Sequence, residues 1–253
     1  MSFSIARDAR PQVRTLLIAV ALTIVLGFIP FAGLATYPFR LFVTFIHEGG
    51  HALAALATGN SVEGLQVAPN GSGLVYTSYG NVFEQMLVAS AGYLGAMIYG
   101  ALLLVFIRRA VAVRAVLYGT AAYILALALL YGFPNFFTIV VGIGLGAALI
   151  AVARYASLRV ANFLLAFLAV QCVVGAIFDL RTLISLSGPF SRGAQTDAAN
   201  MASATHLPPI FWAVVWMVLA LVILAGSLWA YVGVSRADTL AEPPVARRRR
   251  ARI

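Results

Sequence analysis

Charge and cysteine are both scarce in this sequence. Only 10% of its 253 residues are charged, whereas soluble domains carry about 25%. Hydrophobic residues make up 62%, and the mean hydropathy is +0.96. The single cysteine, Cys172, excludes an internal disulfide framework and a cysteine-rich metal site. The composition therefore excludes a soluble globular domain and predicts an integral membrane protein.

Lysine is absent, and all 17 basic residues are arginine. The arginines are concentrated near the two ends of the chain, at Arg7, Arg10 and Arg14 and again at Arg247–Arg250 and Arg252. Basic segments beside membrane spans set topology and contact anionic lipid headgroups. We therefore expect these Arg-rich tails to bind the surface of a lipid bilayer, and we expect no nucleic-acid partner.

Long polar runs are also rare, because apolar segments near the ~20 residues needed to cross a bilayer fill most of the chain. No repeat with a period of about 20–50 residues is present, so we expect one domain over residues 1–253, with its core in residues 40–220. The predicted fold class is an all-α polytopic membrane protein with about six or seven transmembrane helices. The apolar segments are 15–36, 40–58, 83–107, 111–131, 136–153, 159–179 and 210–234.

The arginines leave two alternatives for the orientation of these segments. With seven complete crossings, Arg114, Arg154 and the C-terminal cluster lie on one side of the membrane, as the positive-inside rule requires. The N-terminal arginines then lie on the opposite side. Either one segment does not cross completely, or the N-terminal charges do not determine the orientation.

Two stretches interrupt the apolar pattern. Residues 60–80 contain β-branched and aromatic residues around the turn sequence Pro69-Asn70-Gly71-Ser72-Gly73, which predicts a short β-hairpin. Residues 185–208 form the other long polar connection. A short amphipathic helix is expected there, starting near Thr196 with Thr196 as its N-cap.

The sequence has only three histidines, and two of them lie in one apolar run, "FIHEGGHAL". His47 and His51 are four residues apart, so a helix places both rings on one face, where they can bind one metal ion. Glu48 lies about 100° around the helix, which suits a general base acting on water. The HExxH pattern therefore predicts a zinc site, with Glu48 as the catalytic residue.

A catalytic zinc ion usually has three protein ligands, so a third ligand is needed. Asp179 is the first choice because a free carboxylate near the end of an apolar span is costly, although it could instead pair with Arg181. Asp197 is the alternative third ligand, although it could simply cap a helix in a polar loop. The remaining candidates are His206 and Glu84.

Four stretches of the sequence resemble one family. They are "HEGGHALAALATGNSVEGLQVAPNGSGLVYTSYG", "ASAGYLGAMIYG", "FDLRTLIS" and "TDAANMASATHLPPIFWAVVW". Together they resemble the site-2 proteases, which are intramembrane zinc metalloproteases, and in particular their B-like branch. The better-known members carry an aspartate in a Leu-Asp-Gly motif, whereas here it stands in Phe178-Asp179-Leu180.

The resemblance implies zinc held by His47, His51 and a late-helix aspartate, with Glu48 activating water for peptide hydrolysis. It implies a membrane-protein substrate and a multi-pass protein of the bacterial cell membrane. An exposed strand edge of the hairpin could hold such a substrate in an extended form, although the hairpin could also be a simple connector.

Glycines and small residues predict close helix packing in two places. Gly92, Ala96 and Gly100 form a stripe that can pack against the His-bearing helix, and the Gly49-Gly50 pair permits close approach of another backbone.

Other classes of membrane protein remain as alternatives. A transporter would more often show internal repeats, and a di-iron hydroxylase would need more than three histidines. A catalytically silent relative that binds membrane partners is the main competitor of an active protease.

Overall fold

The computed structural model describes residues 10–29, 32–108, 112–188 and 195–233. Within these ranges the chain forms α1 (Arg10–Phe28), α2 (Gly33–Ala57), β1 (Val62–Val67), β2 (Gly73–Thr77), α3 (Val82–Arg108), α4 (Val113–Tyr131), α5 (Phe136–Tyr155), α6 (Leu158–Leu186), α7 (Asp197–Thr205) and α8 (Pro209–Gly233). The predicted all-α fold with one hairpin is confirmed. The tail arginines Arg7, Arg247–Arg250 and Arg252 lie outside the described residues.

Five of the described helices are long and apolar enough to cross a membrane, namely α3, α4, α5, α6 and α8. The apolar part of α1 is shorter and runs from Val13 to Phe28. Helix α2 has 25 residues, but it carries Arg40 and the HExxH residues. The chain is therefore an integral membrane protein, and its described residues form slightly fewer long apolar helices than the six or seven expected.

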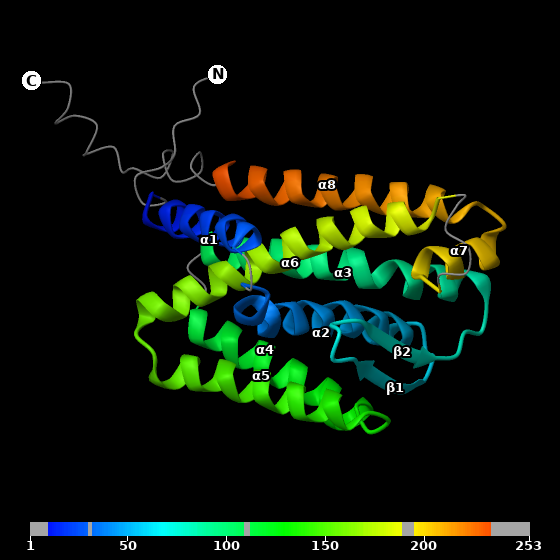
Figure 1. Ribbon diagram of the computed structural model, residues 1–253, viewed down its shortest axis with the longest axis horizontal. Coiled ribbons are helices and arrows are strands. Elements are labelled where there is room, and N and C mark those ends of the chain that lie inside the picture. The colour runs from blue at the N-terminus through cyan, green and yellow to red at the C-terminus, as the bar shows by residue number, and fades with distance from the viewer. Residues whose placement is uncertain (1–9, 30–31, 109–111, 189–194, 234–253) are drawn as a thin grey trace, which may run out of the picture.

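Helices α2 and α3 form the centre of the molecule (Figure 1). Helix α3 packs against α2, α6 and α8, while the antiparallel pair α4 and α5 lies on the far side of α2. Gly50 allows α2 to approach α3 closely, because a Cβ atom there would overlap the carbonyl group of Ala91. Gly92 faces α2 as expected, but Gly100 packs on Cys172 and Val173 of α6, so the small-residue stripe serves two neighbours.

The hairpin packs on one end of α2, as Figure 1 shows. Strands β1 and β2 are antiparallel, with Leu65 opposite Val75 and an irregularity between Val62 and Gly64. Two hydrogen bonds attach the turn to α2. Tyr37 Oη donates to Pro69 O at 2.6 Å, and Thr44 Oγ1 donates to Gly71 O at 2.8 Å. The turn is therefore held against the helix that carries the histidines.

Strand β1 is attached to the rest of the protein along its outer edge. The backbone N–H of Val67 donates to Thr138 Oγ1 of α5 at 2.8 Å, and both residues are buried. Because β1 pairs with β2 on its other side, the outer edge of β2 has no strand partner among the described residues.

Helix α7 begins where the sequence predicts. The Thr196 side chain accepts a hydrogen bond from the backbone N–H of Ala199 at 3.2 Å, which is an N-cap. By contrast, α6 extends to Leu186, beyond the expected end near residue 179. Asp179 therefore lies within α6 and does not end it.

Candidate metal centre

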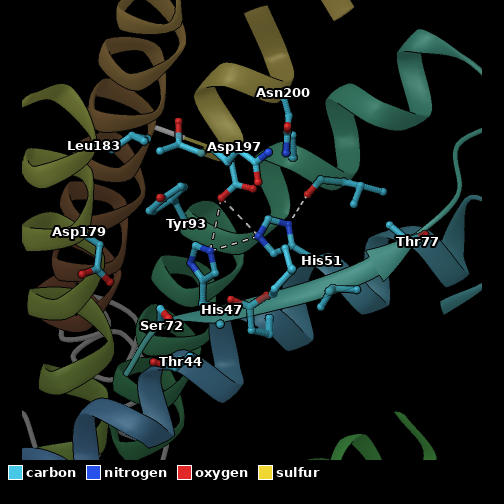
Figure 2. Close-up of a pocket in the computed structure, with 18 of the residues that line it drawn as sticks. Thr44, His47, His51, Ser72, Thr77, Tyr93, Asp179, Leu183, Asp197 and Asn200 are labelled. Carbon is cyan, nitrogen blue, oxygen red and sulfur yellow. Dashed lines mark hydrogen bonds and ion pairs between the residues drawn. The ribbon is translucent and has the colours of Figure 1, made fainter. Parts of the chain in front are cut away.

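The two histidines of α2 point their Nε2 atoms at a common place, as Figure 2 shows. His47 Nε2 and His51 Nε2 are 3.1 Å apart, which follows from their spacing of one helical turn. Both side chains are largely enclosed, with 15% of the His47 side chain and 8% of the His51 side chain exposed. The helix therefore presents two nitrogen ligands to one point.

Asp197 brings a carboxylate oxygen to the same point from α7. Its Oδ2 atom lies 3.5 Å from His47 Nε2 and 3.5 Å from His51 Nε2. Burial alone raises the pKa of Asp197, but the charges of His51 and His47 and their hydrogen bonds outweigh burial and hold this pKa below its ordinary value of 3.8. Asp197 is therefore ionised at neutral pH, as a metal ligand must be.

The three donor atoms fit a tetrahedral zinc ion. Zinc binds nitrogen and oxygen ligands at about 2.0–2.2 Å, so neighbouring ligand atoms lie about 3.3 Å apart. The observed separations of 3.1, 3.5 and 3.5 Å match that value. Two imidazoles and a carboxylate are also ligands that zinc prefers. A zinc ion held by these three atoms would keep a fourth position for water or substrate.

Helix α3 fixes the orientation of the histidine rings. His51 Nδ1 lies 2.6 Å from the carbonyl oxygen of Val88, so Nδ1 carries the hydrogen and Nε2 keeps its lone pair. The His47 ring packs edge-on against Tyr93, with 4.5 Å between ring centroids. Tyr93 in turn stacks on Trp216 of α8 at 5.7 Å. Contacts from α3 and α8 thus hold the rings in place.

Gly92 forms the floor of the site. A Cβ atom at this position would overlap Nε2 of both histidines and Cε1 of His47. Only glycine therefore leaves room at this point of α3 for the two nitrogens and for an ion between them.

Glu48 lies beside the histidine pair and is 4% exposed. None of the described residues donates a hydrogen bond to its carboxylate, although the carboxylate borders the same cavity as the histidines. Gly73, the first residue of β2, packs directly on this carboxylate, and a side chain there would collide with it. Glu48 is thus confined next to the histidines and keeps both oxygens free for water.

The structure places the two candidate aspartates differently. Asp197, the alternative, lies with the histidines, whereas Asp179, the first choice, borders the cavity from α6 and is not part of the group of three. Among the described residues, Asp179 forms no ion pair with Arg181 or with any other arginine.

The two remaining candidates have structural roles. Glu84 accepts hydrogen bonds from Asn60, Asn81 and the N–H of Gly80 at the start of α3. His206 ends α7 with a left-handed backbone, at φ 59°.

A cavity of about 530 Å³ surrounds the site. Helices α2, α3, α6 and α7 contribute to its walls, and residues of β2 and its preceding turn line one side. Figure 2 shows β2 and the preceding Ser72 passing beside the histidines as far as Thr77. The unpaired edge of β2 therefore borders the same space as Glu48 and the three donor atoms.

Sequence reasoning missed four groups that shape this site, namely Gly73, Val88, Gly92 and Tyr93. Gly92 was recognised only as a packing residue. The stretch "AGYLG" carried a signal, because it places glycine and tyrosine side by side on the helix that follows the hairpin. The carbonyl of Val88 has no signal in the sequence, since every residue has one.

The protein has several long apolar helices and a candidate metal site formed by two histidines and one aspartate, with a glutamate beside that site. These features are those of a membrane metallopeptidase. The chain belongs to the Peptidase M50B-like family, because the model of this family matches residues 15–227. That match covers both the histidine helix and α7. A search of curated proteins gives no match, and a search of solved structures gives none either.

Proposed function

We propose that this protein is a zinc-dependent intramembrane peptidase that hydrolyses peptide bonds of membrane-embedded or membrane-adjacent proteins. One observation carries the proposal: three donor atoms of His47, His51 and Asp197 lie at the separations of a zinc tetrahedron, with the free carboxylate of Glu48 beside them. When bound, zinc would polarise a carbonyl oxygen and make water more acidic.

Glu48 supplies the proton transfers in this proposal. Its buried carboxylate has no hydrogen-bond donor among the described residues, so it is free to take a proton from water. The same carboxyl group can then deliver that proton to the departing amine. Gly73 and the HExxH helix limit where the carboxylate can move, so both transfers take place beside the histidine pair.

Strand β2 is the proposed site of substrate binding. A substrate helix has its backbone groups paired internally, and cleavage requires a locally extended segment. The outer edge of β2 borders the cavity and has no strand partner among the described residues, so an extended segment can pair with it by strand addition. The bond from Val67 to Thr138 holds the hairpin in place during this pairing.

The setting of the enzyme is part of the same proposal. We place it in a bacterial cell membrane, with its Arg-rich tails on anionic lipid headgroups and a membrane protein as substrate. Five long apolar helices and the family support the membrane setting.

The decisive experiment compares the wild type with Glu48→Gln and His47→Ala in liposomes. Single-span model peptides are co-reconstituted, fragments are identified by mass spectrometry, and zinc is measured per chain. We expect about one zinc and cleavage in the wild type, zinc without cleavage in Glu48→Gln, and neither in His47→Ala. Retention of zinc by His47→Ala would overturn the metal site. A wild type that binds zinc and cleaves no peptide would instead indicate a catalytically silent relative.

A further inference from the structure

Asp179 is a carboxylate in the polar cavity that the proposed reaction does not use. It borders the cavity from α6, apart from the group formed by Asp197 and the histidines (Figure 2). Its side chain is exposed to the cavity and, among the described residues, takes part in no hydrogen bond and no ion pair. Such a group lies where a substrate would lie.

The charges around the centre leave Asp179 uncompensated. If zinc were bound, the two histidines would be neutral, and Asp197 and Glu48 would balance the two charges of the ion. Among the described cavity residues, Asp179 would then be the excess negative charge. A carboxylate at membrane depth is costly unless it meets a cation. Because no described residue pairs a cation with Asp179, a cation carried by a ligand would compensate this carboxylate.

Among the described residues, the charges of His47 and then of Arg40 act on Asp179, and Arg40 does so without forming an ion pair. Its guanidinium carbon lies 5.4 Å from the centre of the Tyr37 ring, and its side chain packs beside Gly71 at the hairpin turn. Arg40 is exposed and does not line the cavity. Arg40 therefore does not cover the face of the Asp179 carboxylate that borders the cavity.

The wall next to Asp179 suits a long cationic side chain. Leu183 and Leu186 follow on the same face of α6 and line the same cavity, and because Leu183 is almost fully buried, Leu186 offers most of the apolar surface to a chain of methylene groups. Lysine and arginine bury such stems along apolar surface while their charged ends meet a carboxylate. An apolar wall with one carboxylate thus matches these two residue types better than it matches a metal ion.

We propose that Asp179, with the apolar wall of Leu183 and Leu186, forms a subsite that binds a lysine or arginine side chain of the substrate near the scissile bond. This inference rests on the proposed peptidase function and adds a substrate preference to it. Asp179 is a specificity residue in this account and is not a zinc ligand.

The test measures binding, so that it does not depend on catalysis. Octapeptides of alanine and leucine carry a neutral hydroxyethylene group in place of the central amide, and a lysine, glutamine or glutamate on either side of it. Their affinity for the zinc-loaded protein in detergent is measured by fluorescence anisotropy. We expect the lysine peptide to bind roughly tenfold or more tightly than the glutamine peptide on at least one side, and the glutamate peptide to bind most weakly.

Three variants make the result specific. Asp179→Asn should remove the preference for lysine, Asp179→Glu should keep most of it, and Glu63→Gln, which changes an exposed acid of β1 outside the cavity, should leave it unchanged. The inference is overturned if lysine is not preferred, if the preference survives Asp179→Asn, or if Asp179→Asn loses its zinc. Loss of cleavage alone, with binding preserved, would count against the proposed function and not against this subsite.

Discussion

The helix pair α2 and α3 borders two cavities of nearly equal size and opposite chemistry. The polar cavity, of about 530 Å³, contains the HExxH residues and Asp197, whereas the other, of about 550 Å³, is lined almost entirely by apolar side chains such as Leu53, Leu94 and Ile98. Both are built from the same two helices. The difference in polarity between the two cavities therefore comes from the elements that cover each face of the α2–α3 pair.

The polar cavity is covered by the hairpin and α7, which are not among the five long apolar helices. The apolar cavity receives only Tyr123 of α4 in addition to α2 and α3. Polar backbone and polar side chains can lie within a membrane protein only where they line a shielded, hydrated space. The hairpin and α7 create that space on one face of α2, and nothing equivalent does so on the other among the described residues.

Removal of Asp197 should give the largest difference in zinc affinity between a substitution in the polar cavity and one in the apolar cavity. Asp197→Ala takes away one of three proposed ligands, so zinc affinity should fall by more than about 100-fold, which exceeds the usual cost of losing a group that only supports a ligand. Leu53→Ala, in the apolar cavity, is the matched control and should retain its zinc. Competition with a chelator, followed by metal analysis, measures both. Equal zinc affinity in the two variants would contradict the assignment of Asp197.

Two glycines of α3 sharpen the comparison, because one faces each cavity. A Cβ atom at Gly92 overlaps the histidine nitrogens, whereas a Cβ atom at Gly95 meets Gly50 Cα at 3.4 Å, an ordinary contact. Gly92→Ala should therefore lower zinc affinity by about 10- to 100-fold, and Gly95→Ala should change it little. The same chelator competition applies. Similar losses in both variants would indicate a general packing defect of α3.

Acidification should produce a smaller and gradual effect, confined to the polar cavity. The pKa of Asp197 is held below 3.8 by the histidines, so Asp197 stays charged down to about pH 4. Protons then compete with zinc for the ligand nitrogens, because a histidine must be neutral to bind a metal ion. Zinc affinity should therefore fall as the pH is lowered, by at most about two log units per pH unit because two nitrogens compete. Zinc dialysis between pH 7.5 and 5 tests this, and a flat profile would contradict histidine ligation.

The sequence predicts the parts of this site that depend on local spacing. The separation of His47 and His51 sets both rings on one helical face, the turn residues after Pro69 specify the hairpin, and Thr196 is a good N-cap. Each of these features is decided within a few residues of the chain.

The choice between the two aspartates could not be made in this way. Asp179 was preferred because of its depth in the membrane, but that argument says only that a polar setting exists and not which group fills it. Asp197 reaches the histidines because α7 packs on α3 and α8, and this contact depends on the path of the chain between α6 and α7. The end of α6 at Leu186 was likewise not predictable, because the sequence near residue 179 contains no clear signal that ends a helix.

The place of Asp197 along the chain has a further consequence for the whole molecule. A metal ion held by His47, His51 and Asp197 would join α2 to α7 and would close residues 47–197 into one loop. Cross-links that close long loops stabilise a fold by restricting the unfolded chain. The ion would then also tie α7 to α2, because α7 otherwise packs mainly on α3 and α8.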